Sequence, residues 1–229
     1  MKRTAPEIQR AVIIVAVITG GLVLDQRLEF WGQPLTNLGV WGLFLFWLRQ
    51  APPDDQVALV ACVVYAALGE IVLSLVWGLY EYRLGNIPLF VPPGHALLFT
   101  LGSLLATRVN DWIKWVIPLA AAPFVCLALV TGTGTLDALL FVPFLLCILF
   151  GRASRLYAVM FVLALAMEIY GTLLGNWTWG AKVPWLALTT TNPPLAAGAF
   201  YCVLDLLVVA TVARTRRFAG AVPALAPTR

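Results

Sequence analysis

Three carboxylic acids lie inside long apolar stretches of the sequence, at Glu70, Glu168 and Asp205. Ionisable side chains are costly to bury in such stretches, so they usually face the interior of a helix bundle and mark functional sites. A carboxylic acid in apolar surroundings stays protonated near neutral pH and can give its proton to an alkene or a leaving group. A second carboxylate that stays ionised can act as a base or stabilise a cation. These three residues are therefore the first candidates for catalysis.

The depth of these groups predicts where the chemistry takes place. At a rise of about 1.5 Å per residue, Glu70 and Glu168 fall in the outer half of the membrane, and Asp205 lies slightly deeper. We expect all three to line one cavity that opens outward. The alternative interpretation is structural: a buried, hydrogen-bonded carboxyl group that locks helices together.

His95 is the only histidine and follows Pro92-Pro93-Gly94. It is a fourth catalytic candidate, as a general base. As a metal ligand it would combine with the carboxylates in a set that suits a hard or borderline ion. Neither an E-x-x-H nor an H-x-x-x-H spacing is present, so we predict no metal and no other cofactor. The alternative is an interfacial histidine bonded to a loop.

Polar and aromatic side chains gather in the two stretches that follow the glutamates. Aromatic rings are common at any membrane interface. Together they can also form a rim that guides a lipidic substrate, or stabilise a cation with their ring faces. The predicted substrate-binding residues are Tyr80, Tyr82, Arg83, Asn86, Tyr170, Asn176, Trp177, Trp179, Asn192 and Tyr201. Within this set, Tyr170 and Tyr201 are expected to hydrogen-bond the carboxylates.

The elements that must position these residues are transmembrane helices. The chain is 61% hydrophobic and 11% charged, with a mean hydropathy of +0.90, whereas soluble domains are about 25% charged. The apolar runs predict an all-α, polytopic transmembrane bundle of eight spans. The spans are placed near residues 9–25, 33–48, 56–80, 89–106, 112–130, 134–150, 155–175 and 193–213. Residues 1–213 form one transmembrane domain, and 214–229 form a basic, then Ala/Pro-rich cytoplasmic tail.

The distribution of basic residues predicts the orientation. With the N-terminus in the cytoplasm, twelve of the fifteen Lys and Arg residues fall on the inner side, as in inner-membrane proteins. Both termini of this multi-pass protein are therefore expected in the cytoplasm, at a bacterial or archaeal-type plasma membrane. The exceptions are Arg27, Arg83 and Lys182.

The sequence also suggests an internal repeat. Each stretch contains a Glu-Ile pair, then an aromatic-x-aromatic triplet, a proline and a Pro-Pro pair that is expected to open the next helix. The first set is Glu70-Ile71, Tyr80-Glu81-Tyr82, Pro88 and Pro92-Pro93, and the second is Glu168-Ile169, Trp177-Thr178-Trp179, Pro184 and Pro193-Pro194. Spans 1–4 and 5–8 would then form a parallel repeat about an axis along the membrane normal. The alternative is that aromatics and prolines gather at any membrane interface.

The segment Gly78-Leu79-Tyr80-Glu81-Tyr82-Arg83-Leu84-Gly85, followed by Pro88 and Val91-Pro92, resembles the G-x-Y-x-Y…LG…VP signature of membrane carotenoid-biosynthesis proteins, which include bacterioruberin-type hydratases. Residues 168–175 resemble the E-x-x-G-x-x-x-G segment of that family, although the two elements fall in different halves of this chain. The resemblance implies a long isoprenoid substrate inside the bundle. Protonation of a terminal double bond by a carboxylic acid would start a hydration, and water would capture the tertiary cation. Glu70 and Glu168 would be the acid and its partner, Asp205 would assist, and no redox cofactor would be needed.

Two other classes of function remain open. A parallel repeat with central carboxylates also suits a small proton-coupled transporter, and the third class is a non-catalytic membrane subunit. The favoured interpretation is a membrane enzyme with hydratase-like (lyase) or isomerase/cyclase-like activity on a carotenoid-like lipid. Its expected partner is a membrane lipid or isoprenoid substrate. We expect no binding of nucleic acid, because no basic stripe interleaved with aromatics is present, and oligomerisation is left open.

Overall fold

The computed structural model describes residues 5–221 of the chain, and most of these residues are helical. The helices are α1 (Ala5–Arg27), α2 (Gly32–Gln50), α3 (Pro53–Glu70), α4 (Val91–Ala106), α5 (Ile113–Thr131), α6 (Thr135–Phe150), α7 (Ser154–Leu174) and α8 (Gly198–Ala221), with a π-helix, η1 (Ile71–Val76), directly after α3. Two short strands, β1 (Tyr80–Tyr82) and β2 (Trp177–Trp179), complete the fold. The predicted all-α class is therefore confirmed.

Five helical segments are long and apolar enough to cross a membrane: Pro6–Arg27, Pro53–Val76, Ile113–Thr131, Ser154–Leu174 and Gly198–Arg217. Helices α4 and α6 are apolar but shorter. Large apolar side chains face outward along these helices, and Val130, Leu173 and Phe150 are among the most exposed. Such a surface is stable in hydrocarbon and not in water. The helices are those of a multi-pass membrane protein.

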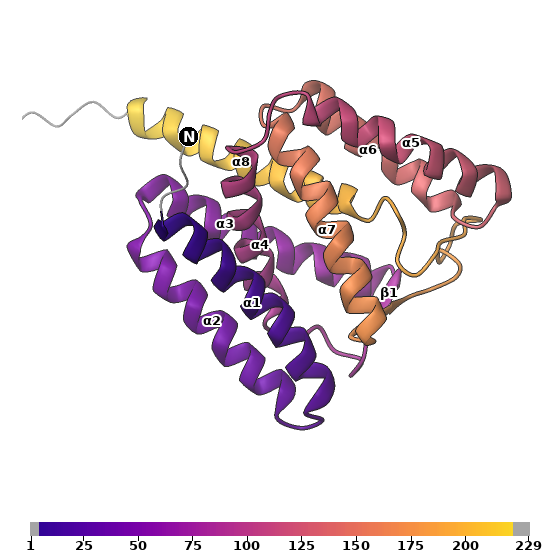
Figure 1. Ribbon diagram of the computed structural model, residues 1–229, viewed down its shortest axis with the longest axis horizontal. Helices are drawn as coiled ribbons and strands as arrows, with labels where there is room; N and C mark the ends of the chain where they lie inside the picture. The colour runs from indigo at the N-terminus through magenta and orange to yellow at the C-terminus, as the bar shows by residue number, and fades with distance from the viewer. Residues whose placement is uncertain (1–4, 222–229) are drawn as a thin grey trace, which may run out of the picture.

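Four helices form the centre of the molecule. Helix α3 packs against α4 and α8, and α7 packs against the same two helices. The pair α1–α2 lies on one side, against α4 and α7, and the pair α5–α6 lies on the other, against α7 and α8 (Figure 1). Each half of the chain thus contributes two central helices and one flanking pair.

Local sequence signals explain several helix ends. Helix α4 begins with prolines in its first turn, where a missing backbone N–H costs little. Helix α7 ends at Gly175, which has a φ of +84°, a conformation that glycine adopts without strain. Helix α3 changes to the wider π-helical winding directly after Glu70. Short π-helical segments are rare and are frequent at functional sites.

The last span differs from the prediction at its start. The Pro193-Pro194 pair does not open α8, which begins at Gly198. Turn-type bonds, from the Ala197 N–H to the Pro194 carbonyl and from the Ala199 N–H to the Ala196 carbonyl, occupy the intervening residues. A side chain at position 198 would collide with the backbone of Phe161 in α7, so the helix starts where glycine allows close packing.

The basic end of the bundle carries the residues that were predicted to face the cytoplasm. Helix α8 continues through Arg214, Arg216 and Arg217 to Ala221, so the first part of the predicted tail is helical. Residues 222–229, with Arg229, and the basic residues Lys2 and Arg3 lie outside the described residues. Ion pairs join helices at this end, from Glu7 to Arg108 and from Asp54 to Arg216.

The strands were not predicted. β1 and β2 pair antiparallel, with Tyr80 opposite Trp179, Glu81 opposite Thr178 and Tyr82 opposite Trp177. Alternate side chains of a strand point to opposite faces. The first and last residues of each strand, Tyr80, Tyr82, Trp177 and Trp179, therefore share one face and are buried. The central residues, Glu81 and Thr178, share the other face and are exposed. The ladder joins the two aromatic triplets at the end of the bundle opposite the basic residues.

Candidate functional site

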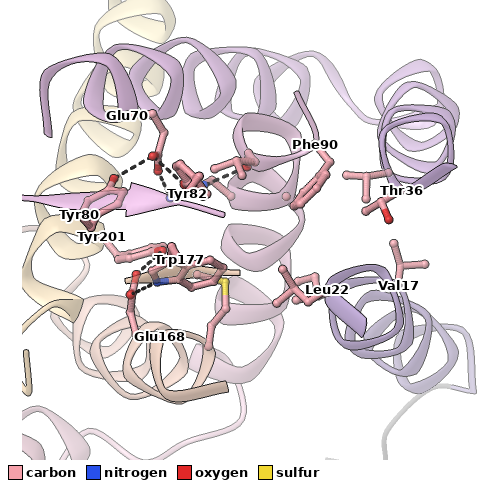
Figure 2. A pocket seen from close by; sticks show the side chains of 16 residues that line it. Val17, Leu22, Thr36, Glu70, Tyr80, Tyr82, Phe90, Glu168, Trp177 and Tyr201 are labelled. Carbon is pink, nitrogen blue, oxygen red and sulfur yellow. Dashed lines mark hydrogen bonds and ion pairs between the residues drawn. The ribbon is translucent and has the colours of Figure 1, made fainter. Parts of the chain in front are cut away.

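Glu70, the last residue of α3, is buried and faces the ladder. Its Oε2 atom accepts hydrogen bonds from the hydroxyls of Tyr80 and Tyr82, both at 2.7 Å. These tyrosines are two residues apart on β1, so both point inward to the same carboxylate (Figure 2). Hydrogen bonds that include a charged acceptor are the strong ones, so the strand fixes the orientation of the carboxyl group.

Glu168 of α7 repeats this arrangement with different donors. Its Oε2 atom accepts hydrogen bonds from the indole Nε1 atoms of Trp177 at 2.8 Å and Trp179 at 3.0 Å. Its Oε1 atom accepts a longer bond of 3.3 Å from the Tyr201 hydroxyl. Each strand of the ladder therefore supplies two donors to one glutamate. In Figure 2 Glu70 lies beside Tyr80 and Tyr82, and Glu168 lies beside Trp177.

His95 of α4 lies next to Glu70 and Tyr201. Its Nδ1 atom is 3.0 Å from the backbone carbonyl of Val91, one turn back in α4. A carbonyl oxygen only accepts, so Nδ1 carries the proton and the Nε2 lone pair of the neutral ring is free. Nε2 is 3.8 Å from Oε1 of Glu70. The imidazole also stacks on the Tyr201 ring, with centroids 4.8 Å apart and planes 5° apart.

Two cavities meet at this cluster. The larger, of about 520 Å³, is lined by α3, η1, α6 and α8, and the smaller, of about 50 Å³, lies toward α1 and α2. Both are lined by Glu70, Tyr80, His95, Glu168 and Tyr201. Ligand pockets typically measure about 300–1,000 Å³, so the larger cavity is in the range for a bulky organic ligand. The smaller one has room for a few waters or a small end group.

The larger cavity is open to the side of the bundle. Its lining includes Leu68, Val72, Val203 and Leu207, which are also on the exposed apolar surface of α3, η1 and α8. In a membrane that surface contacts lipid tails. An apolar molecule can therefore reach the carboxyl groups from the bilayer without passing through water.

The structure brings together most, but not all, of the predicted site residues. Glu70, Glu168, His95, Tyr80, Tyr82, Trp177, Trp179 and Tyr201 surround the two cavities. Asp205 is fully buried and does not line either cavity, contrary to the expectation of one cavity lined by all three acids. Within the described part of the chain neither of its oxygens has a hydrogen-bond partner.

Of the other predicted binding residues, Asn86 and Asn192 hold loops in place, whereas Tyr170 joins α7 to α1 and does not bond a carboxylate, contrary to the prediction. Asn86 donates to Gln33, Asn192 accepts from the Trp179 N–H, and Tyr170 donates to the Thr19 carbonyl. None of the three lines either cavity. Their polar groups bond to other groups of the protein, and residue type alone does not predict these partners.

Arg83 and Asn176 hold the ladder loops by donating to Asp25, a residue that was not predicted from the sequence. Asp25, near the end of α1, is buried and accepts from Arg83 Nη2 at 3.3 Å and from Asn176 Nδ2 at 2.9 Å. It thereby ties both ladder loops to α1. A carboxylate at the end of an apolar run was the available signal. It was overlooked because Asp25 adjoins Gln26 and Arg27 and reads as the start of a loop.

A metal site does not appear within residues 5–221, because no group of three or more His, Cys, Asp or Glu side chains in that range is arranged to hold an ion. Three of the cysteines, Cys62, Cys147 and Cys202, are buried, and Cys126 is exposed on α5. Buried thiols in apolar surroundings act as small packing residues.

Gly171 allows the outer edge of the Trp177 indole to approach α7 closely, because a Cβ atom at this position would overlap the ring. Gly171→Ala should therefore displace the indole and break its bond to Glu168. We expect a loss of about 1–3 kcal/mol of stability, as in other overpacked interiors, together with a shift in tryptophan fluorescence. Gly42→Ala is the control, since nothing lies within 4 Å of a Cβ there. Equal melting temperatures for the two variants would contradict the close packing.

The site therefore consists of two oriented carboxyl groups, one imidazole and five aromatic donors around an apolar cavity. Proton transfer to an apolar substrate is the chemistry that such groups can perform. Comparisons of this chain with protein-family models, with curated proteins and with solved structures gave no match.

Proposed function

We propose that this chain is an integral membrane enzyme that protonates a double bond of a lipidic, carotenoid-like isoprenoid, giving a hydrated, cyclised or isomerised product. The observation that carries the proposal is the pair Glu70 and Glu168 at the inner end of a cavity of about 520 Å³ that opens sideways toward lipid. A long apolar substrate needs such an entrance. A carrier of water-soluble solutes needs openings at both ends of the bundle instead.

The surroundings of the two glutamates suggest different roles. Glu168 accepts three hydrogen bonds, and hydrogen bonds to a carboxylate favour its ionised form. Glu70 accepts two hydrogen bonds, both on Oε2, and its Oε1 atom is 3.8 Å from Nε2 of His95, whose lone pair can exchange a proton with it. We therefore assign Glu70 as the acid, His95 as the group that returns its proton, and Glu168 as the ionised partner.

Hydration would proceed in two steps. The Oε1–H bond of Glu70 breaks, its proton forms a C–H bond with the terminal alkene carbon, and the π-electron pair leaves a tertiary cation and a Glu70 carboxylate. Water then forms a C–O bond to the cation and gives its extra proton to Glu168. To restore the starting state, Glu168 passes this proton to Nε2 of His95, and His95 gives it to the Glu70 carboxylate. The faces of the surrounding tyrosine and tryptophan rings stabilise the cation. In cyclisation, an internal double bond forms a C–C bond to the cation, and the new cation loses a C–H proton to Glu168. In isomerisation, the first cation loses a neighbouring C–H proton to Glu168 and a shifted double bond forms.

The topology belongs to the same proposal. All eight helices would span the membrane, with the basic end in the cytoplasm and the ladder end outside, following the positive-inside rule. The halves 1–4 and 5–8 would be a parallel repeat. This is supported by the equivalent donation of Tyr80 and Tyr82 to Glu70 and of Trp177 and Trp179 to Glu168.

The test is to express the full chain in a bacterial host that accumulates an acyclic carotenoid, purify it in mild detergent and identify bound lipids by mass spectrometry. The wild-type chain should retain a polyene or another isoprenoid. Gly69→Leu places a side chain at a residue that lines the large cavity, where a Cβ meets nothing within 4 Å. It should displace most of the bound isoprenoid.

Gly42→Leu is the matched control, because this glycine of α2 is equally open but lines neither cavity. It should retain the isoprenoid as the wild type does. A chain without isoprenoid that instead drives proton-dependent solute uptake in vesicles would overturn the enzyme proposal and favour a carrier.

A further inference from the structure

A separate crevice of about 440 Å³ lies at the basic end of the bundle, away from the carboxyl pair. One wall is the turn between α6 and α7, with Phe150, Gly151 and Arg152. The other is the C-terminal half of α8. Apolar and small residues of α8 line its length, namely Leu206, Val209, Ala210 and Ala213, and two arginines close it, Arg214 and Arg217.

The charge of this crevice has one sign. Arg152, Arg214 and Arg217 line it, and no acidic residue does. Arg214 and Arg217 are three residues apart on α8, so they lie on one face of the helix. Among the ion pairs of residues 5–221, none involves Arg152 or Arg217. Guanidinium groups bind phosphate oxygens with two parallel hydrogen bonds, and basic pockets between transmembrane helices suit anionic lipid headgroups.

A buried hydroxyl is a second, independent indication of a ligand. Tyr157 of α7 lines the crevice and is fully buried. Within the described part of the chain its hydroxyl has no hydrogen-bond partner. A buried polar group without a partner costs free energy, which an ester or phosphate oxygen in the crevice would recover.

The turn that carries Arg152 is rigidly placed. A side chain on Gly151 would overlap both the Cys147 carbonyl and the Tyr157 ring, so the turn packs directly on α7. Arg152 therefore projects from a fixed backbone, and the wall it forms is preformed. Beside it the Phe150 side chain is 78% exposed, which gives an apolar surface next to the charged one.

We propose that this crevice binds one anionic phospholipid. Its phosphate lies between Arg152 and Arg217, a lipid oxygen accepts from the Tyr157 hydroxyl, and an acyl chain follows the small residues of α8. The combination of a basic end and an apolar channel selects a lipid rather than a free anion. This site is independent of the proposed chemistry at Glu70 and Glu168.

Native mass spectrometry of the full chain in detergent tests the proposal, with phosphatidylglycerol and phosphatidylcholine added in turn. The wild type should hold one phosphatidylglycerol in preference to phosphatidylcholine. The double variant Arg152→Gln/Arg217→Gln should bind it at least about tenfold more weakly, since each basic residue near a membrane surface contributes appreciably to anionic-lipid binding. Tyr157→Phe should weaken binding severalfold while all charges are kept.

Arg155→Gln is the matched control. Arg155 is at the same end but pairs with Asp111 and does not line the crevice, so binding should be unchanged. Equal losses of phosphatidylglycerol binding in Arg155→Gln and in the double variant would show that binding depends only on the positive charge of this end of the bundle. That result would overturn the proposed site.

Inorganic phosphate tests whether the crevice binds a lipid headgroup or a free phosphate ion. If it protects the chain from thermal unfolding as well as phosphatidylglycerol does, the crevice is a soluble-anion site and the lipid proposal fails. Ala213→Leu narrows the apolar channel without changing a charge, so it should lower lipid binding in a chain that remains folded. Unchanged lipid binding in this variant would also overturn the proposal.

Discussion

Glu70→Gln is expected to lower the rate of product formation by at least about a hundredfold, since a positioned general acid contributes about 10²–10⁴ in rate. The amide keeps the shape of the side chain and still accepts from Tyr80 and Tyr82 through its oxygen, but it has no acidic proton. Glu168→Gln should also impair turnover, because a neutral amide cannot take a proton from water or stabilise a cation. The measurement is chromatography and mass spectrometry of polyenes from cells that accumulate an acyclic carotenoid.

Glu81→Gln is the control for this prediction. Glu81 lies on the same strand between the two tyrosines, but its side chain is on the exposed face of the ladder. It should leave product formation at the wild-type level. Full conversion by Glu70→Gln, with the expression level of the wild type, would show that this carboxyl group is not the acid.

Asp25→Ala is expected to have the largest effect on stability. The variant removes the carboxylate that Arg83 and the buried Asn176 share and leaves them only the backbone carbonyls of Asp25 and Leu22 as acceptors. Removing one partner of a buried ion pair costs about 3–5 kcal/mol. The Arg83 side chain is 20% exposed, so we expect the lower part of that range, about 3 kcal/mol, and an apparent Tm lower by roughly 10 °C. Thermal unfolding in detergent, followed by near-UV circular dichroism, measures it.

Two further variants locate the cause of this loss. Asp54→Ala removes a carboxylate from the exposed pair with Arg216, and such pairs contribute at most about 1 kcal/mol. Asp25→Asn keeps a hydrogen-bond acceptor and loses only the charge, so its Tm should fall between those of Asp25→Ala and the wild type. If Asp25→Ala unfolds at the temperature of Asp54→Ala, the ladder loops do not depend on Asp25.

The number and placement of the helices were predictable because each apolar run is long and bounded by polar residues or glycines. The eight predicted runs correspond to eight helices, and α4 and α6 end at or within one residue of the predicted positions 106 and 150. The start of α8 was misplaced because a Pro-Pro pair can open a helix or lie in a turn before it. Only the packing of Gly198 on α7 distinguishes the two cases.

The site was predictable in its acids but not in its geometry. An acidic residue deep in an apolar run signals a buried group whatever the fold, so Glu70 and Glu168 were found. The ladder was not, because its strands are three residues long and nearly 100 residues apart in the sequence. The same limit explains Arg83 and Asn176. Their partner, Asp25, lies in another helix, and no local pattern records that contact.

The two glutamates differ in the kind of hydrogen-bond donor that the ladder supplies, which is tyrosine for Glu70 and tryptophan for Glu168. A phenol hydroxyl both donates and accepts hydrogen bonds, so the hydroxyls of Tyr80 and Tyr82 can accept one proton while they donate another. An indole nitrogen only donates, so Trp177 and Trp179 orient Glu168 but cannot accept a proton from it. The two donors of Glu70 on β1 can therefore also accept a proton, whereas the two donors of Glu168 on β2 cannot, and Glu168 has a hydroxyl partner in Tyr201.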